Sequence, residues 1–288
     1  MLKSRCLRLN ALIALALSIT ILLGGCSFPF GNERVKDDFV RVLDVGQGDC
    51  ILISSNGRTA LIDTATREYG EEIYWELINC GVKAIDVLLL THMHNDHTGA
   101  LPLLSDRFEI KNLILPELVT YSEGIVDAQY AVNVLKQSGG NIYRATQGMN
   151  FNIGEFEITI LASYGDFDEI NNHSLFVMAE IDDVKFMFSG DAEKEAEKRI
   201  LEEGLNVDCD VFKAGHHGSS TSNTEEILKA MSPKYAAISC GVDNSYGHPH
   251  WEVIASFKEM GIKTLRTDTQ GSITFYVDKG KLSATTEY

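Results

Sequence analysis

Short apolar runs in the first half of the chain, beginning at Phe39, are separated by glycine and asparagine turns. They are typical of β-strands, and Asn56-Gly57 between two of them is a strong hairpin signal. Farther along, apolar residues recur at helical spacing over 71–79 and stop at Gly81, which predicts a helix and its end. The pattern predicts strands at 39–45, 50–54, 59–62, 85–90 and 113–115, and helices at 71–79, 99–104 and 124–138.

The second half of the chain shows the same kind of pattern, with strands first and then strands alternating with helices. Asp182-Asp183 separates two apolar runs as a hairpin turn, and a charged helix stops at Gly204. Such an order predicts two sheets packed face to face with helices outside, in one domain over 39–288. The predicted strands are 156–161, 174–181, 184–189, 210–214, 235–239, 264–266, 272–277 and 282–285, and the helices are 192–202, 224–231 and 250–260.

The first 25 residues form a separate segment. Lys3, Arg5 and Arg8 precede an uncharged apolar run from 11 to 23, and small residues follow. A basic start, a short apolar run and small residues are typical of a secretory signal peptide. We therefore predict a signal over 1–25. An uncleaved anchor helix is the alternative, although the run is short for a membrane span, which needs roughly 20 residues.

The end of this segment, Leu23-Gly24-Gly25-Cys26, resembles the lipobox of bacterial lipoproteins. The resemblance implies cleavage before Cys26 and a diacylglyceryl group on its sulfur. Residues 26–38 would then be the lipidated cysteine and a polar tether, and the membrane would be a partner through the lipid. The expected location is the extracytoplasmic face of the cell membrane.

The chain is acidic, with a formal net charge of -16, and the predicted signal carries only basic charges. The remainder is therefore more acidic still. A strongly acidic surface repels polyanions at long range. Non-specific binding to nucleic acid needs a basic patch, and none stands out in the sequence. Nucleic acid is therefore a possible but disfavoured partner, because a local groove could still be basic. Solubility is the alternative explanation of the charge.

Three imidazoles and a carboxylate directly follow the apolar run at 85–90, in the segment Thr91-His92-Met93-His94-Asn95-Asp96-His97. In an extended stretch, residues two apart face the same way, so His92 and His94 can bind one ion. The chain then turns into a helix, which lets Asp96 and His97 reach a neighbouring ion. Imidazole with carboxylate suits zinc, manganese or iron. We predict two divalent metal ions, zinc first and manganese as the alternative.

Further polar residues follow later apolar runs. Asp191 could cap the following helix or bind metal, and the company of the histidine segment favours a ligand. His216 and His217 end another run, so either could bind metal while the other acts on the leaving group. His248 could be a late ligand or a proton donor. For each single histidine, a structural hydrogen bond is the alternative.

The histidine segment matches the HxHxDH signature of the metallo-β-lactamase superfamily, and the resemblance covers nearly all of the chain after the signal. It implies an α/β fold, an αββα sandwich of two mixed sheets with helices outside. Asp63 matches the first motif of the family, an aspartate that braces the histidine loop from behind. Asp191 matches the motif that supplies the bridging carboxylate. The family often places a further histidine ligand where His173 lies, and His173 either binds metal or faces away.

Four other motifs resemble the hydrolase domain of ComEC-type competence proteins and also the bacterial phosphorylcholine esterase group. ComEC-type domains are credited with degrading the non-transforming DNA strand. A lipoprotein signal, the lack of a multi-span channel in the sequence and the complete HxHxDH depart from that pattern and put DNA as the substrate in doubt. The motifs are Asp-Val-Gly-Gln-Gly-Asp at 44–49, Asn-Asn-His-Ser at 171–174, Gly-His-His-Gly-Ser at 215–219 and Tyr-Gly-His-Pro at 246–249.

Together these features predict a lipid-anchored, extracytoplasmic, metal-dependent phosphodiesterase that acts on an envelope or small-molecule phosphodiester. A hydroxide between the ions would attack phosphorus, with Asp96 at the reacting centre, and His216 or His248 would protonate the leaving oxygen. The expected metal ligands are His92, His94, Asp96, His97, His173, Asp191 and His217. The alternatives are a carboxylic ester or lactone hydrolase, a ComEC-like DNA nuclease, and a catalytically silent binding lipoprotein.

Overall fold

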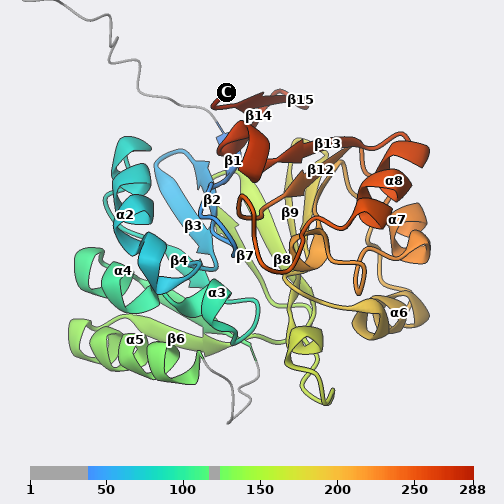
Figure 1. The fold of residues 1–288 in the computed structure, drawn as a ribbon. Helices are drawn as coiled ribbons and strands as arrows, with labels where there is room; N and C mark the ends of the chain where they lie inside the picture. Colours follow the sequence, from blue (N-terminus) through green and yellow to red (C-terminus); the bar gives the residue numbers. More distant parts are fainter. Residues whose placement is uncertain (1–37, 117–123) are drawn as a thin grey trace, which may run out of the picture. The chain divides into compact units, whose positions relative to one another are not determined.

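Two β-sheets face each other in the computed structural model, which describes residues 38–116 and 124–288 (Figure 1). Both sheets are mixed, because each changes from antiparallel to parallel pairing along its width. The first has the order β15-β14-β1-β2-β3-β4-β5-β6. Its strands are β1 (Asp38–Val42), β2 (Ile51–Ser55), β3 (Arg58–Ile62), β4 (Val87–Leu89), β5 (Asn112–Leu115), β6 (Asn141–Arg144), β14 (Ile273–Asp278) and β15 (Lys281–Thr286).

The second sheet has the order β13-β12-β11-β10-β9-β8-β7. Its strands are β7 (Asn150–Ile153), β8 (Phe156–Ala162), β9 (Phe176–Ile181), β10 (Val184–Phe188), β11 (Val211–Lys213), β12 (Tyr235–Ile238) and β13 (Lys263–Arg266). The apolar residues of alternate positions fill the space between the sheets, as Val40 and Val42 do, whereas Phe39 joins the core on the helix side. A slip of one residue would exchange these faces, so this alternation sets the register.

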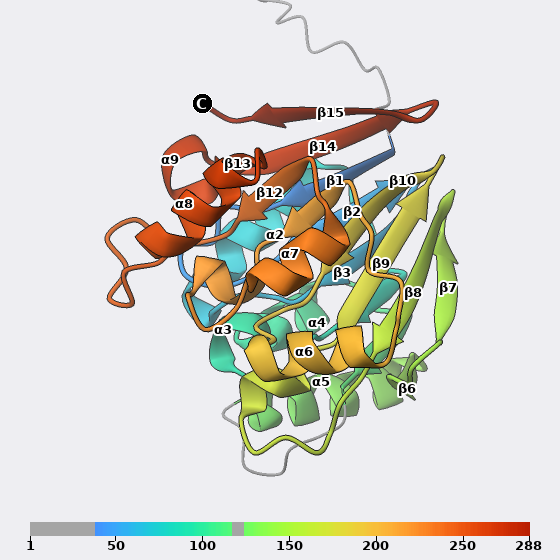
Figure 2. The ribbon, with the colours of Figure 1, turned by 90° about the vertical axis from the view of Figure 1, so that its right-hand side faces the viewer.

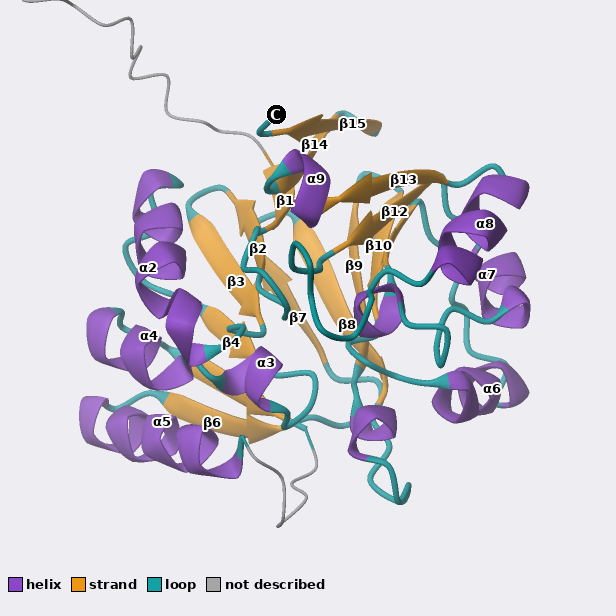
Figure 3. Ribbon diagram, viewed as in Figure 1, coloured by secondary structure: helices purple, strands orange, loops and turns teal. Residues whose placement is uncertain are grey.

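Helices cover the outer faces of both sheets (Figures 2 and 3). One set packs with Leu61 and Leu88 of the first sheet, and the other packs with Phe212 and Ala236 of the second. The first set is α2 (Gly70–Asn79), α4 (Leu101–Arg107) and α5 (Ile125–Ser138), and the second is α6 (Lys194–Glu202), α7 (Glu225–Met231) and α8 (Trp251–Glu259). The expected sandwich of two mixed sheets with helices outside is therefore confirmed.

Several elements differ from the sequence-based expectation. The helix expected at 99–104 is α4, which begins at Leu101, and a separate short helix, α3 (Asn95–Thr98), precedes it. The edge strands β6 and β7 escaped prediction because they are short and largely exposed, so they carry little apolar signal. The short helix α9 (Thr267–Gln270) also escaped prediction.

The signal at 1–25, the lipidation site at Cys26 and the tether up to residue 37 lie outside the described residues. Over the ranges that are described, no helix combines the length and the apolar character needed to cross a membrane.

Candidate metal centre

The side chains expected to bind metal lie at the ends of strands. The histidine segment follows β4, Asp191 follows β10 and His217 follows β11. These strands belong to the parallel parts of the two sheets, and ligands commonly bind outside the carboxyl ends of parallel strands. Gly190 has φ +51°, and a Cβ there would lie 2.7 Å from Thr91 Oγ1. Only glycine allows the loop of Asp191 to approach the histidine segment this closely.

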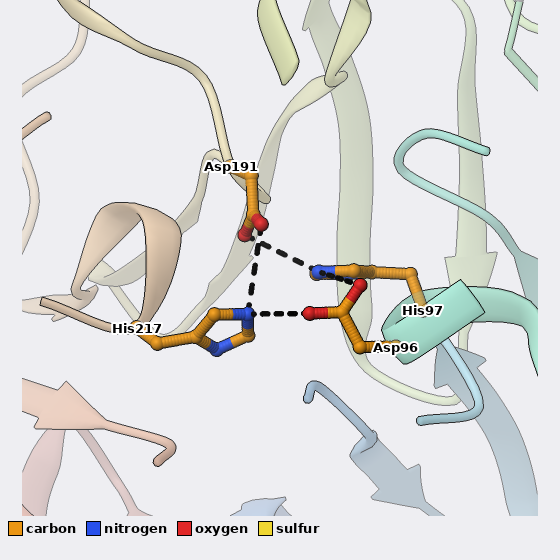
Figure 4. Close-up of side chains that lie close together, drawn as sticks. All are labelled: Asp96, His97, Asp191 and His217. Carbon is orange, nitrogen blue, oxygen red and sulfur yellow. Dashed lines mark ion pairs between the residues drawn. The ribbon is translucent and has the colours of Figure 1, made fainter. Parts of the chain in front are cut away.

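Four of the expected ligands converge on one point (Figure 4). One ligand atom from each of Asp96, His97, Asp191 and His217 lies within 4.8 Å of the others. His97 Nε2 lies 3.3 Å from Asp191 Oδ1, and His217 Nε2 lies 3.3 Å from Asp96 Oδ2 and 3.5 Å from Asp191 Oδ2. His97, Asp191 and His217 are buried. The sequence left open whether His216 or His217 joins the ligands, and the structure places His217 in this group.

This group fits a divalent cation. His97 Nε2, His217 Nε2 and Asp191 Oδ1 are buried and have no hydrogen-bond partner among the described residues. Nearly all buried polar atoms in proteins are paired, so three such atoms facing one another point to a ligand between them. Imidazole nitrogen and carboxylate oxygen are atoms that zinc and manganese bind.

A second group of possible ligands, His92 and His94, also lies beside Asp191. As expected from the sequence, the chain is extended at His94 and turns into a helix, α3, at Asn95. His92 Nε2 lies 3.1 Å from His94 Nδ1 and 3.9 Å from Asp191 Oδ2. Asp191 therefore reaches both pairs of histidines and is placed to bridge two ions. The residues present fit a dimetal site.

Electrostatics in this site depend on burial and on Asp191. Burial lowers the pKa of His92 well below 6.5, which keeps the ring neutral, as a metal ligand must be. Burial also opposes charge on His97 and His217, but Asp191 raises the pKa of both well above 6.5. Burial would raise the pKa of Asp191, yet His97 and His217 hold it well below 3.8. The site attracts positive charge strongly.

His216 and His248 stand on the wall of a cavity of about 450 Å³ over the centre. His216 Nε2 lies 3.7 Å from Asp191 Oδ2, and the rings of His216 and His248 are 5.4 Å apart. His248 Nδ1 accepts a hydrogen bond of 3.3 Å from Gln47 Nε2. Burial, with His217 and His216 nearby, lowers the pKa of His248 to about 4. At neutral pH His248 therefore carries its proton on Nε2 and can donate it in a hydrogen bond.

His173 is not brought into this group. It lies in the 3₁₀ turn Ile170–His173, and its Nε2 donates to the carbonyl oxygen of Phe167 at 2.8 Å. Over the described part of the chain, no ion pair or hydrogen bond joins it to the other expected ligands. Of the two readings that the sequence left open, its placement favours the one in which His173 faces away.

Comparison with known proteins agrees with this geometry. The sequence model of the family described as "Metallo-beta-lactamase superfamily" matches residues 43–242, a span that holds the whole centre. The chain belongs to the metallo-beta-lactamase superfamily. The YhfI protein of Bacillus subtilis, a solved metallo-beta-lactamase fold protein, superposes with a TM-score of 0.51 at 10% identity, over 80% of this chain and 96% of that one. Such a likeness shows the fold.

Within the superfamily, the chain is similar to ComEC-type competence proteins. It is 32% identical to ComE operon protein 3 of Bacillus subtilis over 259 residues, 82% of this chain and 32% of that protein. It is 30% identical to competence protein ComA of Neisseria gonorrhoeae over 269 residues, 93% of this chain and 36% of that protein. The chain thus spans about a third of the length of these relatives. The resemblance of the short motifs to ComEC-type proteins is confirmed.

A shorter match links the chain to ribonuclease Z of Clostridium beijerinckii. The two are 32% identical over 105 residues, which is 34% of this chain and 30% of that protein.

Asp63 lies directly behind His97. His97 Nδ1 donates to Asp63 Oδ2 at 2.7 Å, and Thr91 donates to the two carboxylate oxygens from its backbone N–H and its hydroxyl, each at 2.7 Å. This bonding keeps a proton on Nδ1, so that Nε2 is the nitrogen that would give up its proton to bind a cation. Asp63 therefore has the position expected of the aspartate that braces the histidine loop in this superfamily.

Replacing Asp63 with asparagine is expected to weaken metal binding by about 10- to 100-fold, because the amide presents a donor where His97 and Thr91 need an acceptor. The affinity for Zn²⁺ and for Mn²⁺ would be measured by titration calorimetry. Asp86→Asn is the matched control, since Asp86 is also buried but pairs with Arg58 and Lys111 at the start of β4. Equal losses in both variants would contradict the bracing role.

Sequence reasoning gave no role to two residues that the structure places behind His217. Asp49 Oδ2 lies 2.7 Å from Lys213 Nζ, and Asp49 Oδ1 lies 3.3 Å from His217 Nδ1. Asp49 and Lys213 are both about 1% exposed. His217 Nδ1 donates to the carbonyl oxygen of Ser239 at 3.0 Å, so Asp49 adds a buried negative charge behind His217 rather than its hydrogen bond. The available signals were a lysine within the apolar run at 211–214 and, far from it in the chain, an aspartate at the end of the glycine-rich loop at 44–49.

The turn that carries His217 is strained. His216 and His217 have φ of +49° and +53°, a region that non-glycine residues seldom occupy, and such strain costs about 1–3 kcal/mol for each residue. The Asn223 side chain stabilises the turn by bonding to the backbone of Gly215 and Ser219. Because several hydrogen bonds hold the turn in place, the two rings take fixed and different directions.

Proposed function

We propose that this chain is a metal-dependent phosphodiesterase. The observation that carries the proposal is the position of Asp191, between two pairs of histidines at the base of a cavity of about 450 Å³. Two-ion sites with a shared carboxylate are typical of enzymes that displace groups at phosphorus. The similar ribonuclease Z is, by its name, an enzyme that cleaves phosphodiesters. A carboxylic ester or lactone is the competing substrate class.

Each residue of the centre has a role in this proposal. When bound, the ions would lower the pKa of a water molecule and stabilise negative charge on the substrate. Asp96, His97, His217 and Asp191 would hold one ion, and His92 and His94 would hold the other with Asp191. His248 lines the cavity and, neutral at pH 7, would donate a hydrogen bond from Nε2–H to an oxygen of the substrate. His216 stands beside Asp191 as the second candidate donor.

The substrate is proposed to lie in the envelope or to be a small molecule. The lipobox-like sequence ending at Cys26 would hold the chain at the outer face of the membrane through a lipid, and the net charge of -16 disfavours long polyanions. The similarity to ComEC-type competence proteins favours DNA as the second candidate substrate.

The test of the proposal is hydrolysis of bis-p-nitrophenyl phosphate and p-nitrophenyl phosphorylcholine by the full chain, with Zn²⁺ or Mn²⁺. Turnover that needs metal and disappears in Asp191→Ala would support a phosphodiesterase. A protein that binds two ions but cleaves only p-nitrophenyl acetate or a lactone would instead be a carbonyl ester hydrolase. Cleavage of single-stranded DNA at a higher rate than of either small diester would favour the nuclease.

Replacing His248 with alanine is expected to slow the hydrolysis of alkyl phosphodiesters by about 100-fold, the cost of removing one hydrogen-bond donor from an oxygen that gains negative charge in the transition state. The effect on p-nitrophenyl esters should be much smaller, because p-nitrophenolate spreads its charge over the ring and needs no such donor to leave. Rates would be compared for a methyl and a p-nitrophenyl ester of the same phosphate. A loss of equal size for both leaving groups would show that His248 acts elsewhere.

A further inference from the structure

The segment before β9 is tied to both sides of the metal centre. The backbone N–H of Leu175 donates to the carbonyl oxygen of Thr91 at 3.1 Å, next to His92. The backbone N–H of Asp191 donates to Ser174 Oγ at 3.0 Å. The 3₁₀ turn Ile170–His173 therefore stands beside the centre, and one of its side chains can face the ions.

The polar side chains of this turn point in different directions. His173 is bonded to the carbonyl of Phe167, and Asn172 Oδ1 accepts from the backbone N–H of Glu193 at 2.9 Å. Both side chains thus fasten the turn to its surroundings. Asn171, in contrast, lines the cavity over the centre together with His94 and is 7% exposed.

The amide of Asn171 has one defined orientation. Its Nδ2 donates to Glu193 Oε1 at 3.2 Å, and a carboxylate can only accept, so the carbonyl oxygen must face the other way. That oxygen, Oδ1, is buried and has no hydrogen-bond partner among the described residues. The same Glu193 oxygen lies 3.4 Å from His216 Nδ1, and His216 Nε2 lies 3.7 Å from Asp191 Oδ2. Two side chains, Glu193 and His216, therefore connect the amide to Asp191.

The unpaired oxygen needs a cation or a hydrogen-bond donor. A phosphodiester group offers only acceptor oxygens, so it cannot satisfy Asn171 Oδ1. The two halves of the centre are also unequal: Asp96, His97, His217 and Asp191 supply four ligands to one ion, whereas His92, His94 and Asp191 supply three to the other. Amide carbonyl oxygens are common ligands of divalent cations.

We propose that Asn171, and not His173, is the ligand from this segment, with its Oδ1 bound to the ion held by His92 and His94. The inference rests on the proposed function only in requiring two ions, and it is tested by metal binding without a substrate. A chain that binds two ions but cleaves no phosphodiester would therefore reject the proposed function and leave this inference standing.

The experiment measures the number of bound ions and their affinities, with Zn²⁺ and with Mn²⁺ alone, by titration calorimetry and native mass spectrometry on the full chain. Asn171→Ala is expected to lose one ion or to bind it at least about tenfold more weakly. His173→Gln, which keeps a donor for the Phe167 carbonyl, is expected to bind two ions as the unchanged chain does. Melting temperatures would show that both variants are folded.

Two further variants separate ligation from packing. Asn171→Asp combined with Glu193→Gln exchanges donor and acceptor between the two side chains, keeps an oxygen at position 171, and should bind two ions. Glu193→Ala removes the partner of the Asn171 amide. This variant should still bind two ions, and its loss of metal affinity should be smaller than that of Asn171→Ala. Two ions bound with unchanged affinity by Asn171→Ala would overturn the proposal. Loss of one ion in His173→Gln would also overturn it. So would a loss of metal affinity in the double variant Asn171→Asp/Glu193→Gln as large as that in Asn171→Ala.

Discussion

Replacing Asp191 with alanine is expected to lower kcat/KM for phosphodiesters by at least about 10³-fold, the equivalent of about 4 kcal/mol of transition-state stabilisation. Asp191 is the one carboxylate among the described residues that reaches both pairs of histidines, so its loss affects both ions. The measurements are steady-state turnover of bis-p-nitrophenyl phosphate and the number of bound Mn²⁺ or Zn²⁺ ions. Both should fall together.

Asp191→Asn separates charge from shape. The amide has nearly the same size, but it cannot share two anionic oxygens between two ions, so we expect turnover to fall almost as far as in the alanine variant. Unfolding curves of both variants would confirm that the fold persists. Retention of more than about a tenth of the activity in either variant would contradict the bridging role, because a tenfold change corresponds to only about 1.4 kcal/mol.

Replacing Asp49 with alanine is expected to reduce the free energy of unfolding by about 3–5 kcal/mol, because it leaves the Lys213 ammonium buried without a counter-charge. His217 would keep its hydrogen bond to the Ser239 carbonyl but lose the negative charge 3.3 Å from its Nδ1, which should weaken metal binding by about tenfold. Chemical denaturation in the presence of EDTA measures the first effect, and metal titration measures the second.

The double variant Asp49→Ala/Lys213→Met separates the two effects. Removing both charges should restore most of the free energy of unfolding, since no unpaired ion remains buried. Metal affinity should stay low, because His217 still lacks its carboxylate. The buried ion pair would be contradicted if the free energy of unfolding of Asp49→Ala lay within about 1 kcal/mol of that of the unchanged chain. Such a difference is well below the cost of an uncompensated buried charge.

The Asp49 ion pair also predicts a pH dependence. Burial would raise the pKa of Asp49, but Lys213 and His217 lower it from 3.8 to about 2. A carboxylate whose pKa is depressed in the folded state stabilises the fold above its unfolded pKa and loses that contribution as the pH falls. In EDTA, the unchanged chain should therefore lose stability between about pH 4 and pH 2 more steeply than the double variant. Parallel curves over that range would contradict this assignment.

The local pattern of the chain was enough to predict the first half of the metal centre. His92 and His94 are two residues apart in an extended stretch, and Asp96 and His97 lie in the helix that follows, so their directions depend only on neighbouring backbone. The alternation of apolar residues likewise predicted most strands, because one face of each had to be buried. The edge strand β6 escaped because it buries little.

Tertiary structure decided what depends on distant parts of the chain. The position of His217 next to Asp96 and Asp191 depends on a turn with positive φ, and no alternation of apolar and polar residues encodes the direction of a side chain in such a turn. The pairing of Asp49 with Lys213 joins the loop after β1 to a strand of the other sheet, so it exists only once the two sheets have packed. The sequence by itself thus determined the family, the fold and the local set of candidate ligands. Whether each remaining side chain faces the centre or makes a structural bond was decided by the packing of one sheet on the other, because only that packing brings residues far apart in the chain within bonding distance.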